Sequence, residues 1–160
     1  MFGWLKGVFD SRGTGQESHV SEATVKQADA MIAAGKEEVA GLNFKSAIDA
    51  HLKWKTRLRA VIDGTSEEKL DPQVIAMDNQ CVLGKWIYGA GGEKFGTYPH
   101  FKTLRAEHAK FHRCASSVLE LALAKKTQEA MKEIDSGEYR YVSLKVTGEL
   151  AQLFVELGKK

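Results

Sequence analysis

The chain has 160 residues, of which 43% are hydrophobic and 28% are charged, an ordinary composition for a soluble globular protein. At this length roughly two-thirds of the unfolded surface is buried on folding, so one domain needs no disulfides. The formal net charge of +2, without a block of like charge, argues against nucleic acid as a partner. No apolar run reaches the ~18 residues of a membrane-spanning helix. Two cysteines and the lack of a secretory leader predict a cytoplasmic protein.

The first 35 residues are predicted to be an extension of the main domain. Residues 1–9 carry apolar side chains at helical spacing, and the glycine-containing stretch 10–15 is typical of a flexible linker. Two interpretations of residues 1–9 stay open. They form either a frayed tail or a short helix that docks on a partner or, less favoured, on a membrane surface.

A first helical region is predicted over residues 21–62, with Gly35 and Gly41 as points where it breaks or bends. Gly64 is a plausible end for this region. Apolar side chains follow one another at helical spacing in its second half, and the stripe includes one histidine. Its members are Phe44, Ile48, His51, Leu58 and Ile62.

A second helix is predicted to begin at Asp71-Pro72, with aspartate as the cap and proline in the first turn. It is expected to carry Cys81 and Tyr88 on one face and to end at residues 89–92. A third helix is predicted from Pro99 to about residue 125. Two more follow, over about 127–134 and 141–157. The sequence therefore predicts an all-α fold, an antiparallel four-helix bundle with an extra N-terminal helical segment.

Four potential metal ligands fall on the apolar faces of the predicted helices. They are His51, Cys81, His108 and His112. A single histidine in an apolar stripe is more often an ordinary core residue, but here that explanation must hold four times. Burying several imidazoles and a thiol together is costly unless each is satisfied, and a shared metal ion satisfies all of them. Three imidazoles and one thiolate form a complete tetrahedral set for Zn2+.

The spacing of these residues resembles the chemoreceptor zinc-binding domain family. The motifs are His51-x-x-Trp54, Cys81-x-Leu-Gly-x-Trp86 and His108-x-x-x-His112, and the similarity extends over roughly residues 36–158. The resemblance implies a helical bundle in which these three histidines and the cysteine bind one zinc ion. It also implies a homodimer, and a link to bacterial signalling proteins such as a chemoreceptor or a cyclic-di-GMP-synthesising enzyme. No output domain follows in this sequence, so a standalone form is expected.

Other residues near the motifs have simpler predicted roles. Trp54 and Trp86 are expected to wall the metal site off from water. Gly84 is expected to let a neighbouring helix or the metal approach closely, and Asp49 or Asp78 is a candidate to orient an imidazole. The second cysteine, Cys114, lies two residues beyond His112, which turns it away from the site on a helix, so it is expected to be a core residue.

The leading hypothesis is a cytoplasmic zinc-binding sensory module. Four protein ligands leave no open position on the metal, and the sequence shows no nucleophile–base pair, phosphate loop or paired acids, so no enzymatic activity is expected. The family is associated with sensing zinc and oxidants such as hypochlorous acid, and a zinc-bound thiolate at Cys81 is oxidisable. The alternative is a purely structural, zinc-stabilised adaptor bundle. A diiron site is less favoured, because such sites use carboxylates.

Overall fold

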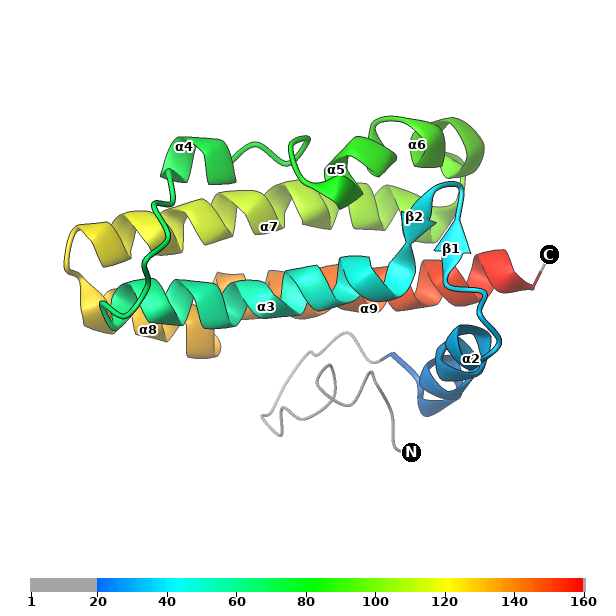
Figure 1. Ribbon diagram of the computed structural model, residues 1–160, viewed down its shortest axis with the longest axis horizontal. Helices are drawn as coiled ribbons and strands as arrows, with labels where there is room; N and C mark the ends of the chain where they lie inside the picture. The colour runs from blue at the N-terminus through cyan, green and yellow to red at the C-terminus, as the bar shows by residue number, and fades with distance from the viewer. Residues whose placement is uncertain (1–19, 160) are drawn as a thin grey trace.

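The computed structural model describes residues 20–159, and it confirms the predicted all-α class. Three long helices run alongside one another, with α3 and α7 in one direction and α9 in the other (Figure 1). These helices are α3 (Phe44–Ile62), α7 (Pro99–Leu123) and α9 (Glu138–Gly158). Residues 72–95, which we call the arm, return along α7 in the direction of α9 and complete the antiparallel arrangement. The arm holds the short helices α4 (Pro72–Ile75), α5 (Val82–Ile87) and α6 (Ala90–Phe95).

The first predicted helical region is divided into two helices by a small β-hairpin. Helix α2 (Glu22–Ala33) packs against α9, and α3 begins after strands β1 (Glu38–Val39) and β2 (Leu42–Asn43). Ala40 and Gly41 both have positive φ, as a tight two-residue hairpin turn requires. The break at Gly41 was expected, but the strands were not, because two-residue strands are too short to show an alternating pattern.

The core lies between the long helices and is rich in aromatic side chains. Phe44 of α3 stacks on Phe154 of α9 at a centroid distance of 5.1 Å, and it meets the edge of Trp86 at 5.5 Å. Trp86 also donates a hydrogen bond from Nε1 to the carbonyl of Ala40, at 3.1 Å. These contacts fasten α5 and the hairpin to the frame of long helices.

The single helix predicted from residue 71 to residue 88 is wrong. Helix α4 begins as expected, with Asp71 capping the amide of Gln73, but it ends at Ile75, and α5 begins only at Val82. Aspartate and asparagine at positions 78 and 79 favour local turns over a helix interior. Residues 89–92 end α5 as predicted, but they also begin α6.

The remaining helices follow the prediction closely. Helix α7 spans almost the whole predicted stretch, and α8 (Thr127–Ser136) connects it to α9. Among residues 20–159, no helix has the length and hydrophobicity needed to cross a membrane. The amphipathic stretch 1–9 and the linker 10–15 lie outside the described residues.

Candidate metal centre

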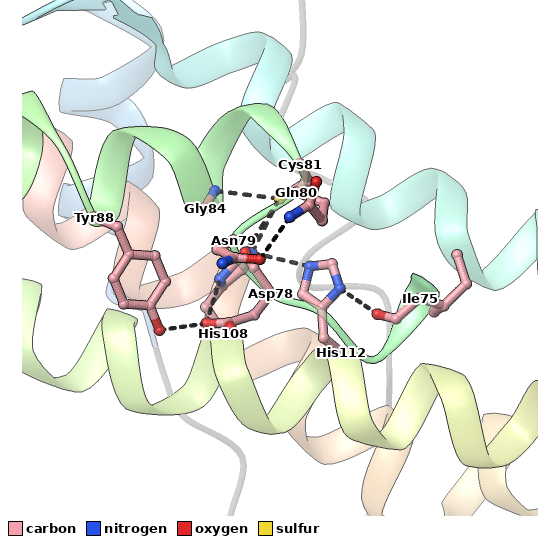
Figure 2. Close-up of polar contacts among 9 residues, drawn as sticks. All are labelled: Ile75, Asp78, Asn79, Gln80, Cys81, Gly84, Tyr88, His108 and His112. Carbon is pink, nitrogen blue, oxygen red and sulfur yellow. Dashed lines mark hydrogen bonds and ion pairs between the residues drawn. The ribbon is translucent and has the colours of Figure 1, made fainter. Parts of the chain in front are cut away.

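The structure brings the four predicted ligand residues together from three separate segments. His51 comes from α3, His108 and His112 come from successive turns of α7, and Cys81 stands at the start of α5. One potential ligand atom from each lies within 4.8 Å of the others. Figure 2 shows Cys81, His108 and His112 converging from the arm and α7. The three histidines are at most 4% exposed.

The two donor-atom distances measured from Nε2 of His108 fit a tetrahedral zinc ion. Nε2 of His108 lies 3.2 Å from Nε2 of His112 and 3.4 Å from Sγ of Cys81. Normal zinc bonds at tetrahedral angles separate two nitrogens by roughly 3.3 Å, and a nitrogen and a sulfur by roughly 3.6 Å. His108, His112 and Cys81 are therefore close to the spacing that one shared ion requires, and the donor atom of His51 lies within 4.8 Å of theirs.

Backbone carbonyls fix which nitrogen of two histidines faces the cluster. Nδ1 of His51 donates to the carbonyl of Ala47 at 2.7 Å, and Nδ1 of His112 donates to the carbonyl of Ile75 at 2.7 Å. A carbonyl only accepts, so each Nδ1 carries the proton and each Nε2 keeps a free lone pair. Nε2 of His51 is buried without a hydrogen-bond partner, which is unfavourable unless a metal ion binds there.

Burial keeps the three imidazoles uncharged. It lowers the pKa of His51 from 6.5 to about 4 and, together with the neighbouring imidazoles, lowers the pKa of His108 to about 2. The pKa of His112 is also lowered, mainly by burial. Neutral imidazole is the form that binds a metal, so the histidines need lose no proton at neutral pH.

Cys81 is not on the face of a helix, as the sequence suggested, but at the N-cap of α5. Its Sγ accepts a hydrogen bond from the amide of Gly84 at 3.2 Å. Burial raises the pKa of the Cys81 thiol, whereas the amides at the helix start act in the opposite direction. A cation among the imidazoles would supply the further stabilisation that the thiolate needs.

Gly84 permits a close approach, but the group that approaches is the backbone of the preceding loop and not the neighbouring helix or the metal that was expected. A Cβ at this position would lie 1.8 Å from the carbonyl oxygen of Asp78. Any side chain here would push the loop before Cys81 away from α5. Gly84 therefore sets the position of the sulfur as well as donating a hydrogen bond to it.

One of the two candidate orienting carboxylates lies at the site. Oδ2 of Asp78 is 3.8 Å from Nδ1 of His108, and it accepts a hydrogen bond from the hydroxyl of Tyr88 at 2.7 Å. That hydrogen bond is the main reason why the pKa of Tyr88 is raised. Asp49 instead pairs with Lys45, one turn earlier on α3, at 2.8 Å.

The aromatic surroundings of the cluster differ from those predicted. The ring contacts of Trp86 are with Phe44, Phe95 and Phe101, and Trp54 lies beneath the guanidinium of Arg57. Instead, Phe111 lines the site, with its ring 5.2 Å from that of His51 and 5.7 Å from that of His112. Its place in the apolar stripe of α7, next to His112, was the available signal. Cys114 is a half-buried free cysteine packed against the core.

Comparison with known protein families agrees with this arrangement. Residues 51–119 match the family model of the chemoreceptor zinc-binding domain. This stretch of the chain is similar to a chemoreceptor zinc-binding domain. All four clustered residues fall within the matched stretch, and their imidazole and thiol groups are the donors that zinc prefers. The protein is thus a zinc-binding module with a helical fold. Searches of curated proteins and of solved structures gave no match.

Proposed function

We propose that His51, Cys81, His108 and His112 are the four ligands of one zinc ion in a sensory module. The observation that carries this proposal is the convergence of their donor atoms within 4.8 Å. Four protein donors complete a tetrahedral shell, which is typical of a structural or regulatory site and leaves no position for a substrate. Such a shell supports a non-catalytic role for the site.

The arm is the element through which such a module would respond. Helix α4 buries no residue. Its polar ties to α7 are the hydrogen bond from Ser116 Oγ to the Pro72 carbonyl, at 2.8 Å, and the one from His112 to Ile75. In contrast, α5 is fastened by the buried side chains of Leu83, Trp86 and Ile87. Loss of the bond between zinc and sulfur would therefore loosen residues 72–81 and leave α5 and the long helices in place.

An oxidant acts on the same bond. Attack of the Cys81 thiolate on hypochlorous acid and hydrolysis of the product give a sulfenic acid and chloride. Sulfur loses the two electrons that the chlorine gains. A sulfenic acid is a weaker metal ligand than a thiolate, since the thiolate is the metal-binding form. Zinc depletion and oxidation thus converge on one structural change.

We further propose that the response passes to a separate bacterial signalling protein, such as a chemoreceptor or a cyclic-di-GMP-synthesising enzyme, in the cytoplasm. The arm exposes apolar side chains that a partner or a second copy in a homodimer would contact, namely Val74, Met77 and Val82. In this proposal the zinc-binding bundle spans residues 36–158, and residues 1–35 are its extension.

The test combines metal analysis with hydrogen exchange. Purified protein is expected to hold about one zinc per chain by mass spectrometry of the metal. A stoichiometric pulse of hypochlorous acid should release zinc and speed amide exchange in residues 72–81, but not in α5. The matched control is Cys114→Ser, which should respond like the wild type.

The outcome separates the sensor from its alternative. Zinc that stays bound, with unchanged exchange after the pulse, would favour a structural, zinc-stabilised adaptor. A protein that holds no zinc, or holds iron, would overturn the ligand assignment.

A further inference from the structure

We propose that Tyr88 is a positioning residue of the zinc centre, which holds the carboxylate of Asp78 against the imidazole of His108. This inference rests on the ligand set proposed above. Tyr88 does not belong to that set, and it is a 47% exposed residue at the end of α5. Its hydroxyl nevertheless points back toward the cluster, as Figure 2 shows.

One oxygen atom of Asp78 accepts a hydrogen bond from Tyr88 and also faces the ring of His108. The Tyr88 hydroxyl donates to Oδ2 at 2.7 Å, and Nδ1 of the His108 ring lies 3.8 Å from the same oxygen. That nitrogen is fully buried and has no hydrogen-bond partner of its own. The carboxylate is thus the acceptor toward which the His108 ring points, and a small movement brings it within hydrogen-bond distance.

His108 depends on this acceptor more than the other two histidines do. His51 and His112 have backbone carbonyls at 2.7 Å to fix their rings. The acceptor of His108 is instead a side chain that is 20% exposed and can rotate toward water. A hydrogen bond on the outer nitrogen of a metal-binding imidazole fixes the ring and raises its basicity. A residue that restrains the Asp78 carboxylate therefore also restrains the orientation of the His108 ring.

The backbone of Asp78 is already fixed, because its carbonyl lies against Gly84. Only the side-chain torsions remain free, and the Tyr88 hydroxyl restrains them. The guanidinium of Arg105 lies 4.9 Å from the centre of the Tyr88 ring and holds it from outside. Arg105 and His108 are neighbours on α7, so the contacts form a closed circuit from α7 through Tyr88 and Asp78 back to α7.

The experiment measures zinc affinity by competition with a chromophoric chelator in the wild type and four variants. Asp78→Asn is expected to weaken zinc binding by about 10- to 100-fold, the usual effect of losing such a partner. Tyr88→Phe, which removes only the hydroxyl, is expected to weaken it by about 3- to 10-fold. The double variant should bind zinc with the same affinity as Asp78→Asn alone. Tyr141→Phe, at a similarly exposed tyrosine on α9, should leave the affinity unchanged.

A spectroscopic measurement separates positioning from general destabilisation. In the cobalt-substituted protein, the ligand-field bands of Tyr88→Phe should shift in the same sense as those of Asp78→Asn, while the far-ultraviolet circular dichroism stays that of the wild type. The inference is wrong if Tyr88→Phe binds zinc like the wild type or more tightly. It is equally wrong if the effects of the two substitutions on the free energy of zinc binding are additive.

His108→Ala distinguishes this failure from a failure of the proposed function. If His108→Ala loses stoichiometric zinc and Tyr88→Phe has no effect, only the positioning role is refuted. If His108→Ala binds zinc as the wild type does, the ligand set itself is wrong.

Discussion

The long helices and the arm contribute to the zinc cluster in different ways. The long helices supply all three histidines, each within a stripe of buried apolar side chains. The arm supplies Cys81, the carbonyl of Ile75 and the carboxylate of Asp78, yet α4 buries nothing. The imidazoles are buried among the side chains of the long helices, whereas the thiol lies on a segment whose side chains, such as Ile75, are only partly buried. In the proposed site, zinc would therefore join the buried histidines of the long helices to the partly buried arm.

The largest expected effect tests whether the three long helices α3, α7 and α9, which form the frame, contribute most of the stability of the fold. Phe154→Ala removes a fully buried ring stacked on Phe44 and should lower the free energy of unfolding by about 3–5 kcal/mol. Val74→Ala, at a 48% exposed position on the arm, should change it by less than about 0.5 kcal/mol. Denaturant unfolding of the zinc-loaded proteins measures both. Equal effects would show that arm and frame contribute alike.

The next effect concerns the bond that joins the two halves. Cys81→Ala should weaken zinc binding by roughly 100-fold or more, since a structural zinc site is worth about 10–16 kcal/mol over four ligands. Helical content should stay near that of the wild type, because the frame does not depend on the sulfur. Chelator competition and circular dichroism measure the two quantities. Wild-type zinc affinity in this variant would refute the role of Cys81.

The frame was predictable from the sequence, whereas the arm was not. The stripes around His51 and around His108 and His112 extend over many residues at helical spacing, so α3 and α7 follow from periodicity alone. In the arm, Cys81 caps a short helix, and the break before it comes from Asp78, Asn79 and the approach to Gly84. Such tertiary contacts produce no periodic pattern in the sequence.

The four metal-binding candidates were identified from residue type and spacing, but their supports were not. The carbonyls of Ala47 and Ile75 belong to residues whose side chains carry no polar group, so nothing in the sequence marks them. Tyr88 appeared to belong to the apolar face of a long helix. Its hydroxyl reaches Asp78 because the predicted helix is divided into α4 and α5, with Asp78 in the turn between them. Only the three-dimensional structure reveals this division.

The pH dependence of the metal-free protein tests how firmly the frame holds the histidines. The unfolded chain takes up a proton on His51 below about pH 6.5, whereas the folded chain does so only below about pH 4. Between these values the unfolded state binds more protons, so stability is retained above pH 6.5 and lost as the pH falls toward 4. The loss from His51 alone is roughly 3 kcal/mol.

Urea unfolding of chelator-treated protein at a series of pH values measures this loss. His51→Gln should make the loss smaller by the share of His51, because the lowered pKa values of His108 and His112 still contribute to it. His100→Gln, whose ring pairs with Glu149 outside the cluster, should keep the full loss. A wild-type profile that stays flat between pH 7 and 4.5 would mean that the frame opens and lets water reach the imidazoles.

The smallest expected effect isolates the weak attachment of the arm. Ser116→Ala removes the hydroxyl that donates to the carbonyl of Pro72, at a net loss of about 0.5–1.5 kcal/mol. That carbonyl keeps its bond from the amide of Ala76, so no buried acceptor is left unpaired. Amide exchange in residues 72–81 should therefore quicken in the metal-free variant and change little in the zinc-loaded one. An equal change in both forms would show that zinc does not fasten the arm. A change that extends into α5 would show that the arm opens as one unit instead of yielding first at α4.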